Sequence, residues 1–369
     1  MKIAILGFTK VSYMPYLHFY LGQINQTEND VSLIYWKRDE KEDAPVPNGV
    51  SAYAFCESMS DALPLWKKLP KFYGYRRFAI KALKKIKPDF VIVLHSTTGI
   101  TVLDYIKKKY AKKYIFDYRD VTYESNSVYR KMVASLAENS ALTFTSSDGF
   151  RKFLPSLPNV LTSHNITRDI LDVREELRAK KKSSDKVRIG FWGLLRSYDV
   201  NLKMIEAFGD DERFELHYYG RAQGKMLALM DESVKKYSNV FFHGEYKPKD
   251  RAKFAWNTDL IHNLYDNNDR TMRHAMANKY YDGISFFLPQ LCSRGTFMAE
   301  AAVSAGIGLS CDVFSKSFAD EVYGYFNSLE REDFCASCDI ELERIMVQVE
   351  DGESKIKEVL DNANKQLGR

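Results

Sequence analysis

The sequence predicts an α/β fold made of two Rossmann-like, doubly wound domains that face a central cleft. Its 369 residues are too many for one ordinary hydrophobic core and suit two domains of about 150–190 residues each. Short apolar runs alternate with longer stretches of helical periodicity, and a charged segment divides this alternation into two similar halves. The runs are apolar at nearly every position, which is typical of parallel strands covered on both faces.

The N-terminal half, expected to form one domain over residues 1–166, opens with a buried strand at 2–7. Further strands are predicted at 31–35, 90–94, 114–117, 142–145 and 160–162, and helices at about 13–24, 73–86, 102–110 and 128–137. Pro88 ends the second of these helices, since proline cannot continue the hydrogen-bond ladder. Small polar or charged residues follow each strand, as expected at the sheet edge where α/β proteins bind ligands.

The charged segment 167–186 contains RAKKKSSDK and is interpreted as the linker between the domains. The alternation resumes over 187–339, the predicted C-terminal domain. Its strands are expected at 187–192, 214–219, 240–242, 260–264 and 286–291, and its helices at about 201–208, 226–234, from 297 onward, and at 314–326. A last helix at about 340–369 is expected to pack back on the N-terminal domain.

Composition and charge exclude several classes of protein. No run approaches the roughly 18 apolar residues of a membrane span, and the apolar stretch after Met1-Lys2 is too short for a secretory signal. Five scattered cysteines argue against a disulfide framework. The net charge of +5 is too small to indicate nucleic acid by itself. We therefore expect a cytoplasmic protein without a nucleic-acid partner.

A basic and aromatic segment runs from Leu63 to Pro88. It contains nine Lys and Arg residues, no acidic residue, and five interleaved aromatic residues. This combination suits an anionic membrane surface, where aromatic rings lie at headgroup depth and cations meet anionic lipid. The alternative interpretation is that the segment forms a helix with a solvated basic face and an aromatic face in the protein core. A nucleic-acid patch is a less favoured third interpretation, because no known binding module surrounds the segment.

The segment 278–308, which begins NKYYDG, has features of an anion-binding site. Lys279 and Asp282 are three residues apart, so they share a face of the helix predicted there. A loop with Gly295 and Thr296 then precedes another predicted helix, whose first amides are placed to stabilise a diphosphate. The alternative is that the Asn-Lys pair at the helix start is a cap with a solvated charge.

Two further groups of residues follow predicted strands. Gly193 and Arg196 end the first strand of the C-terminal domain, where glycine admits a ligand to the backbone and arginine can bind a diphosphate bidentately. In the loop DYRDVTYE, Asp120 can take a proton from a hydroxyl or orient it. The alternative for the first group is a tight turn with an exposed Arg196. The alternative for the second group is a network of Arg119 and carboxylates that fixes the loop. His95 follows the strand predicted at 90–94, at the same edge of the sheet. It is interpreted either as a site residue or as an ordinary polar residue of the surface.

Several common motifs are absent from the sequence. The first strand is followed by GFTKVS instead of GxGxxG, which disfavours a dehydrogenase, and no GxxxxGK[ST] supports a P-loop kinase. The sequence also contains no GxSxG nucleophile elbow and no cluster with metal-ligand spacing, so no metal site is expected.

The motifs, taken in order, resemble those of a known family. The first half reads IFDYRD, TSSDGF and NVLTSHNI, and the second reads IGFWGLLRS, LHYYG, VFFHGEY and NKYYDGISFFLP. This series is similar to that of bacterial glycosyltransferases of the two-domain GT-B type, most of all the retaining group called family 4, or group 1. Its members build capsule, exopolysaccharide or lipopolysaccharide. They move a sugar from a nucleotide-diphospho donor to a glycan or polyprenyl-linked acceptor.

The resemblance implies a role for each candidate residue. The donor side would consist of Gly193, Arg196, Asn278, Lys279, Asp282, Gly295 and Thr296. Within it, Arg196 and Lys279 would neutralise the diphosphate, and Asp282, where the family has Glu, would hold the ribose hydroxyls. The catalytic pair would be Asp120 and Arg119, with Gly7, Lys10 and His95 on the acceptor or sugar side. No cofactor or metal is implied, since protein cations and a helix dipole take the charge of the leaving group.

Two departures from the family pattern leave the stereochemistry open. His274 stands where the family often has the first of two acidic residues. The family also commonly has a lysine after the Arg196 position, and here Lys203 is the only possible substitute for it.

The alternative functions are a sugar-nucleotide 2-epimerase of the same fold and a non-catalytic two-domain sugar-nucleotide-binding protein. If the transferase interpretation holds, the segment from Leu63 to Pro88 docks the enzyme on the inner face of the membrane.

Overall fold

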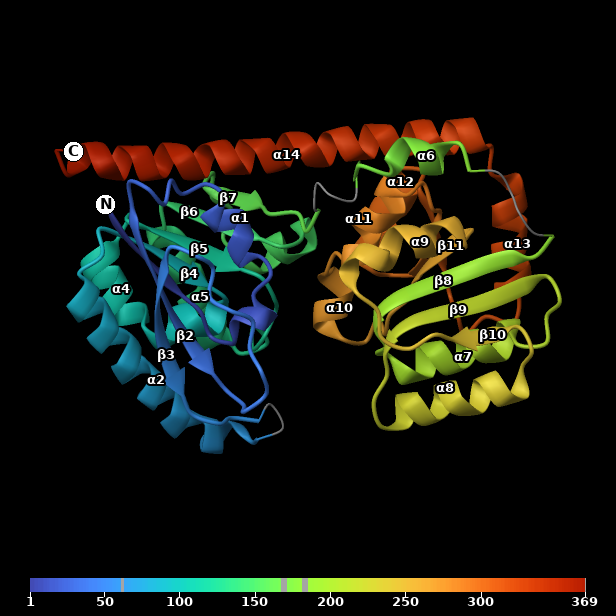
Figure 1. The fold of residues 1–369 in the computed structure, drawn as a ribbon, viewed down its shortest axis with the longest axis horizontal. Helices are drawn as coiled ribbons and strands as arrows, with labels where there is room; N and C mark the ends of the chain where they lie inside the picture. Colours follow the sequence, from blue (N-terminus) through green and yellow to red (C-terminus); the bar gives the residue numbers. More distant parts are fainter. Residues whose placement is uncertain (61–62, 167–170, 181–184, 369) are drawn as a thin grey trace. The chain divides into compact units, whose positions relative to one another are not determined.

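The computed structural model describes residues 1–60, 63–166, 171–180 and 185–368. The chain forms two compact units: unit 1 comprises residues 1–164 and 347–369, and unit 2 comprises residues 165–346. Each unit contains one parallel sheet with helices on both faces (Figure 1). The predicted α/β fold with two doubly wound, Rossmann-like domains is confirmed.

The sheet of unit 1 has seven strands in the order β3-β2-β1-β4-β5-β6-β7. The strands are β1 Lys2–Leu6, β2 Asp30–Lys37, β3 Val50–Cys56, β4 Phe90–Leu94, β5 Tyr114–Tyr118, β6 Leu142–Thr145 and β7 Val160–Thr162. All pairs are parallel, and in the centre Ile5 of β1 is in register with Leu33 of β2 and Ile92 of β4. The carboxyl ends of all these strands therefore meet at one edge.

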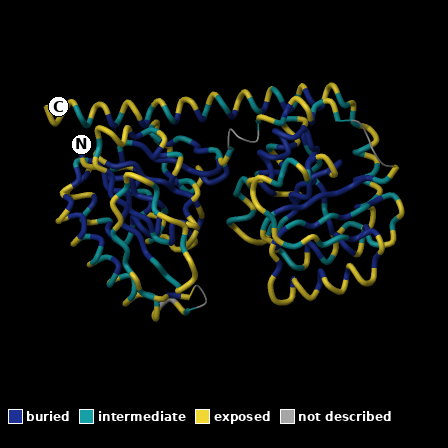
Figure 2. Tube along the Cα trace, in the orientation of Figure 1, coloured by how far each residue is buried: buried dark blue, intermediate teal, exposed yellow. Residues whose placement is uncertain are grey.

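Helices cover both faces of this sheet. They are α1 Leu17–Leu21, α2 Leu65–Ile86, α3 Ser96–Thr101, α4 Leu103–Tyr110, α5 Ser127–Asn139 and the second half of α14 Arg331–Gln366. Alternate strand residues such as Ile3 and Ile5 pack with α1 and with Ile356 and Leu360 of α14 on one face. The helices α2, α3 and α5 lie on the other face. Figure 2 shows the strands buried and the outer sides of α2 and α14 exposed.

The sheet of unit 2 has six strands in the order β10-β9-β8-β11-β12-β13, all parallel. The strands are β8 Val187–Leu194, β9 Phe214–Arg221, β10 Val240–Phe242, β11 Leu260–Asn263, β12 Gln290–Ser293 and β13 Gly308–Cys311. One face packs against α7 Tyr198–Phe208, α8 Lys225–Lys236 and α13 Phe318–Ser328. The other face packs against α6 Arg174–Arg178, α9 Arg251–Trp256 and the end of α11 Asn278–Ser285. The remaining helices of the unit are α10 Arg270–His274, α12 Phe297–Ser304 and the first half of α14.

The structure differs from the sequence predictions at several elements. The strand expected at 286–291 is β12, at Gln290–Ser293. Residues 286–288 instead form a buried turn after α11, in which the Leu288 amide donates to the Gly283 carbonyl at 2.9 Å. An unbroken apolar run marks burial without distinguishing strand from turn, which is why the prediction was wrong.

Two other elements were missed or shortened. The strand β3 lies between the strand expected at 31–35 and the helix expected at 73–86, where no element was predicted. The helix α2 begins at Leu65 instead of 73, because Pro70 is accommodated inside the helix. Part of the linker predicted at 167–186, residues 167–170 and 181–184, lies outside the described residues. Its described part contains the short helix α6.

Candidate functional site

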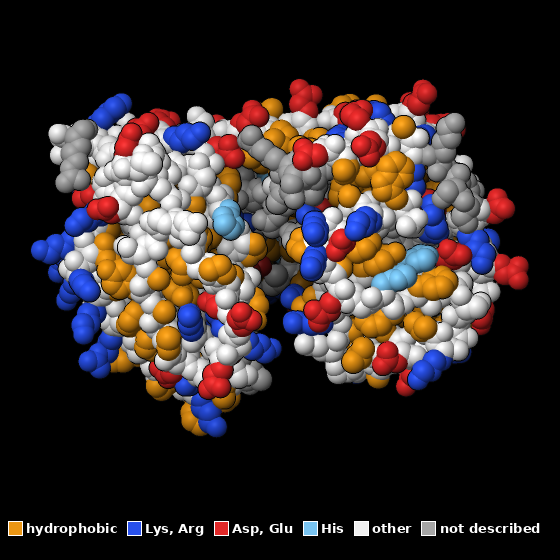
Figure 3. All heavy atoms as spheres, viewed as in Figure 1, with side chains coloured by type: hydrophobic (Ala, Val, Ile, Leu, Met, Phe, Trp, Pro, Cys, Tyr) orange, Lys and Arg blue, Asp and Glu red, His pale blue; other side chains and the backbone are white. Residues whose placement is uncertain are grey.

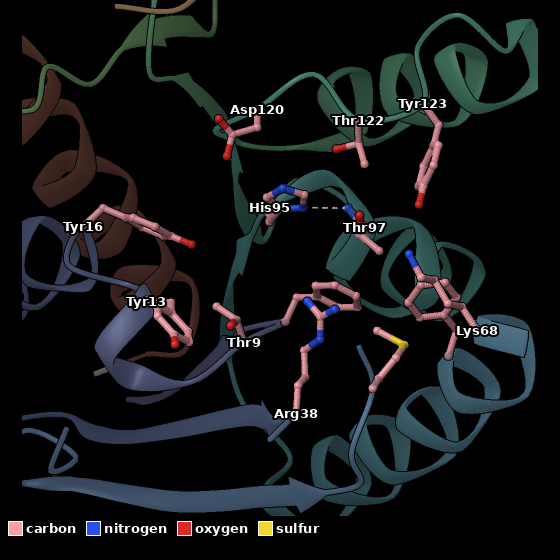
Figure 4. A pocket seen from close by; sticks show the side chains of 13 residues that line it. Thr9, Tyr13, Tyr16, Arg38, Lys68, His95, Thr97, Asp120, Thr122 and Tyr123 are labelled. Carbon is pink, nitrogen blue, oxygen red and sulfur yellow. Dashed lines mark hydrogen bonds between the residues drawn. The ribbon is translucent and has the colours of Figure 1, made fainter. Parts of the chain in front are cut away.

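A cavity of about 330 Å³ lies at the carboxyl edge of the unit 1 sheet. We call it the unit 1 cavity, and Figure 4 shows its side chains. It is lined by Phe8, Thr9, Tyr13, Tyr16, Arg38, Met59, Lys68, Phe72, His95, Thr97, Asp120, Thr122 and Tyr123. These residues follow β1, β2, β3, β4 and β5 or belong to the first half of α2. The cavity therefore occupies the edge at which ligands of parallel α/β sheets bind.

The structure separates the two predicted catalytic residues. Asp120 is exposed and its carboxylate lines the unit 1 cavity. Arg119 is buried outside the cavity lining, where it donates to Asp117 Oδ2 at 3.0 Å and to Ser163 Oγ at 3.1 Å. Burial raises the pKa of Asp117, and the Arg119 guanidinium opposes that rise. Arg119 thus takes part in the loop-fixing network that the sequence offered as its alternative.

His95 combines an unusual backbone with a defined tautomer. Its φ of 75° lies in the left-handed region, which is rare for a non-glycine residue and is often found at functional sites. Its Nδ1 accepts the Thr97 amide proton at 3.2 Å. Burial lowers the pKa of the imidazole, so the ring is neutral and its proton is on Nε2. His95 therefore offers a hydrogen-bond donor beside Asp120 (Figure 4).

Gly7 and Lys10, predicted on the acceptor side, do not line the cavity. The Gly7 carbonyl accepts the Tyr75 hydroxyl at 2.5 Å, and a Cβ at Gly7 would lie 2.6 Å from Met14 Sδ. Lys10 is buried and pairs with Asp39 and the Lys41 carbonyl. These two residues hold the loop after β1 in place.

Sequence reasoning missed two cations of the cavity, Arg38 and Lys68. Arg38 follows β2, so the rule applied to the other strand ends would have found it once the strand was extended to Lys37. Lys68 belongs to the basic segment but was not distinguished from its neighbours. Only the fold shows which cations of that segment point inward.

In unit 2, Lys279 is buried at the carboxyl edge of the sheet. Its ammonium donates to Tyr265 Oη at 2.5 Å and lies 4.0 Å from the ring centroid of Phe191. His262 lies next to it, and burial together with the Lys279 charge lowers the His262 pKa to about 3. The predicted donor lysine is thus a fixed cation beside the ends of β8 and β11.

Asp282, predicted to hold the ribose, has both carboxylate oxygens engaged. Trp192 Nε1 donates to one oxygen and Arg251 Nη1 to the other, each at 2.7 Å. Burial raises the pKa of this carboxyl, whereas Arg251 and Trp192 oppose the rise. In this structure Asp282 joins α11 to β8 and α9.

The loops after β8, β11 and β12 are joined by hydrogen bonds. The Asp266 amide donates to Ser197 Oγ at 3.1 Å, and the Tyr265 amide donates to Ser293 Oγ at 2.8 Å. Thr296 caps α12, because its Oγ accepts the Ala299 amide at 3.2 Å. The edge that carries Lys279 is therefore continuous with the start of α12.

The other predicted donor residues surround this edge. Arg196, Asn278 and Gly295 are exposed. Gly193 has a φ of 134°. Apart from its two chain neighbours, no atom of the described residues lies within 4 Å of the Cβ it would carry, so a ligand can approach its backbone. A Cβ on Gly220 would lie 1.7 Å from the Gly193 carbonyl oxygen, so only glycine fits beside it.

The outer face of α2 carries exposed aromatic and apolar side chains. Trp66, Leu69 and Tyr73 are 67%, 56% and 61% exposed. Lys and Arg side chains gather along the edge of unit 1 that α4 and α2 form (Figure 3). None of the helices in the described ranges has the length and apolar content needed to cross a bilayer. Within the same ranges, no three His, Cys, Asp or Glu side chains form a metal-ion site.

Known structures resemble this chain over its whole length. Sucrose-phosphate synthase from Thermosynechococcus elongatus superposes with a TM-score of 0.66 at 10% identity, covering 100% of this chain and 97% of that chain. The chain has the GT-B fold. WaaG, a glycosyltransferase involved in lipopolysaccharide biosynthesis, gives a TM-score of 0.63 at 14% identity, with coverage of 96% and 99%.

A third structure with this GT-B architecture contains a nucleotide. Anabaena HepE in complex with UDP gives a TM-score of 0.59 at 12% identity and covers 100% of this chain and 98% of that chain. Neither a protein-family model nor a curated protein matches the sequence. The likeness therefore lies in the fold.

Proposed function

We propose that this GT-B protein is a glycosyltransferase. It transfers a sugar from a nucleotide-diphospho donor to a hydroxyl of a glycan or lipid-linked acceptor, in the synthesis of a bacterial surface polysaccharide. The observation that carries the proposal is the full-length likeness to WaaG and to proteins solved with UDP or a UDP-sugar. The lipopolysaccharide role of WaaG supports the choice of product.

In this proposal, unit 2 binds the donor. Cleavage of the bond between the anomeric carbon and the diphosphate leaves negative charge on the phosphate oxygens. Lys279, held by Tyr265 and Phe191, is a cation already in position to stabilise that charge. The first amides of α12, behind Gly295 and Thr296, add further donors. The proposed reaction accordingly uses neither a metal ion nor a cofactor.

Unit 1 binds the acceptor. Asp120 takes the proton of the attacking hydroxyl or orients it, and the Nε2–H of His95 donates a hydrogen bond to an oxygen of the sugar or the acceptor. The new bond joins the acceptor oxygen to the anomeric carbon, and the diphosphate leaves. We include retention of configuration in the proposal, and the anomeric coupling constant of the product tests it.

The proposal also places the enzyme at the inner membrane face. Trp66, Leu69 and Tyr73 are exposed in the first half of α2, and the last turn of the same helix carries the exposed cations Lys84 and Lys85. Rings and aliphatic side chains of this kind insert at headgroup depth, and lysines interact with anionic lipid. A membrane-anchored acceptor would then be close to the unit 1 cavity, since Lys68 and Phe72 of the same helix line it.

The first experiment is a thermal-shift screen of the full-length protein against UDP, GDP, CMP, ADP and NAD. We expect one nucleoside diphosphate to raise the melting temperature, because a ligand that binds only the folded state stabilises it. Lys279→Met should lose the shift, and Lys235→Met, at an exposed lysine of α8, should keep it. A shift with NAD alone, or none with any nucleotide, would contradict the proposal.

A turnover assay then separates the transferase from its alternatives. The matching nucleotide sugar is incubated with a lipid-extract acceptor, and release of nucleoside diphosphate is measured together with the sugar product. Conversion of the sugar nucleotide into an epimer without acceptor would favour the 2-epimerase. Binding without either reaction would favour a sugar-nucleotide-binding protein.

A further inference from the structure

We propose that unit 2 binds a divalent transition metal ion, for which Zn²⁺ is the probe, between His217 and His243. His217 belongs to β9, and His243 directly follows β10, the edge strand that pairs with it. Figure 3 shows histidine side chains at the surface of this unit, among hydrophobic ones. The two histidines are not among the residues assigned to the donor or the acceptor, so the inference goes beyond the proposed function.

The two imidazoles have the spacing of a pair of metal ligands. Nδ1 of His217 lies 3.2 Å from Nε2 of His243. Two nitrogens of a tetrahedral zinc site are about 3.3 Å apart, since each Zn–N bond is roughly 2.0–2.1 Å long. The His243 side chain is exposed, so a tilt of its ring can turn both lone pairs toward one ion.

Glu215 fixes the tautomer of His217. Its Oε2 lies 3.4 Å from Nε2 of the ring. An ionised carboxylate only accepts, so Nε2 carries the proton and Nδ1 carries the lone pair that faces His243. Histidines that bind a metal usually donate their second N–H to a carboxylate in this way, which orients the ring and raises its basicity. Glu215 therefore already occupies the position of such an outer partner.

The proton between the two rings belongs to His243. Its Nε2 donates to Nδ1 of His217 in the metal-free pair. An ion that binds between the two nitrogens takes the place of this proton, which moves to Nδ1 of His243 and gives the other neutral tautomer. Each ring then donates one electron pair to the ion, and water fills the remaining positions. Burial lowers the pKa of both imidazoles, so neither ring is charged at pH 7.5.

Aromatic rings fix the orientation of the two histidines. Phe241 stacks on His217 with ring centroids 4.7 Å apart. Tyr219 stacks on His243 at 4.2 Å, and its other neighbour is the ring of Phe254 in α9, at 3.9 Å. Ligands whose orientation is fixed by packing need little reorganisation when the ion binds.

Charges near the pair are balanced. The charges of Arg188 and Asp259 both act on His217. Arg188 donates to both carboxylate oxygens of Asp259 at 3.0 Å, so the fields of these two groups largely cancel at the imidazole. Lys186 lies 3.9 Å from Glu215 and balances its charge in the same way.

The ligand type determines which ions fit. Imidazole nitrogens suit Zn²⁺, Cu²⁺ and Ni²⁺, whereas Mg²⁺ and Ca²⁺ prefer oxygen ligands. The pair supplies two protein ligands. It thus differs from a cluster of three His, Cys, Asp or Glu side chains, none of which occurs in the part of the chain that the structure describes. A bound ion would link the edge strand β10 to β9 and stabilise unit 2.

The test is a calorimetric titration of the full-length protein, expressed without a histidine tag, with Zn²⁺ and with Mg²⁺ at pH 7.5. We expect one Zn²⁺ to bind per chain, and Mg²⁺ to bind about tenfold or more weakly. Zn²⁺ should also raise the melting temperature, because the pair exists only in the folded state.

Three variants assign the site. His243→Gln removes a ligand and should weaken Zn²⁺ binding by about a hundredfold or more, whereas Glu215→Gln removes the outer partner and should weaken it about 10- to 100-fold. His18→Gln is the control, since it removes an exposed imidazole from α1 of unit 1 and should bind Zn²⁺ as wild type does. Because His243 is exposed, urea unfolding of its variant without metal should be unchanged.

Three results would overturn the inference: no one-to-one binding of Zn²⁺, equal binding of Zn²⁺ and Mg²⁺, or Zn²⁺ affinity in His243→Gln that is the same as in wild type. The thermal-shift screen with nucleotides is read without added metal. Failure of the metal site can therefore be told from failure of the proposed function.

Discussion

The carboxyl edges of the two sheets carry charge in different ways. In unit 2, Lys279 and Asp282 are buried and held by named partners: Tyr265 for the lysine, Trp192 and Arg251 for the aspartate. In unit 1, Asp120 lines an open cavity opposite two cations. The comparison suggests a division of tasks. A rigid cationic edge suits a diphosphate of constant shape, and an open cavity suits an acceptor that must enter and leave.

The largest effect is expected from Asp120→Asn in unit 1. Loss of a group that accepts or orients the hydroxyl proton should reduce kcat about 10²- to 10⁴-fold. Because Asp120 is exposed, urea unfolding should be unchanged. The control is Asp231→Asn on the exposed face of α8. A kcat within threefold of wild type would remove Asp120 from the chemistry and weaken the contrast between the two edges.

Lys279→Met in unit 2 should have the next largest effect on turnover. If this cation stabilises the leaving diphosphate, kcat/KM should fall by about 2–4 kcal/mol of transition-state stabilisation. Methionine retains the packing against Phe191, so a fall in activity without unfolding isolates the charge. Lys235→Met serves as control, and a loss below threefold with intact fold would show that Lys279 is only structural.

Membrane binding tests whether unit 1 alone meets the lipid. Lys84→Glu with Lys85→Glu should weaken binding to anionic liposomes by about 2 kcal/mol or more, roughly thirtyfold, since each nearby lysine contributes about 1 kcal/mol. Co-sedimentation with phosphatidylserine vesicles measures the change. Lys235→Glu with Lys236→Glu, on α8 of unit 2, makes the same charge change and should bind as wild type does. Equal binding of all three proteins would exclude the α2 surface as the contact.

The smallest effect concerns the buried edge of unit 2. The pKa of His262 is lowered to about 3, so between pH 6.5 and 5.5 the unfolded state binds a proton that the folded state does not. Stability contributed by neutral His262 is therefore lost as pH falls, by about 1.4 kcal/mol over one pH unit at most. Urea unfolding of wild type and His262→Gln at both pH values measures this. An unchanged pH slope in the variant would mean that His262 binds a proton as readily in the folded state as in the unfolded state, which would contradict the lowered pKa.

Local patterns were enough to predict the α/β class and much of the element order. Unbroken apolar runs such as Phe90 to Leu94 are readable because parallel strands are buried on both faces. The start of α12 behind Thr296 was also readable, since a capping threonine next to a glycine is a local signal. The same reasoning failed at 286–288, where an apolar run forms a turn.

The sequence by itself thus determined the parallel sheets, their carboxyl edges and several residues that stand there, including Lys279, Asp120 and His95. Only the tertiary structure decided which of these side chains face a cavity. Gly7, Lys10 and Arg119 follow strands as Asp120 does, yet they are bound by Tyr75, Asp39 and Asp117. Arg38 and Lys68 meet only because α2 packs against the sheet beside β2. Sequence spacing describes positions along one element, whereas a binding site depends on the direction of side chains from several elements packed together.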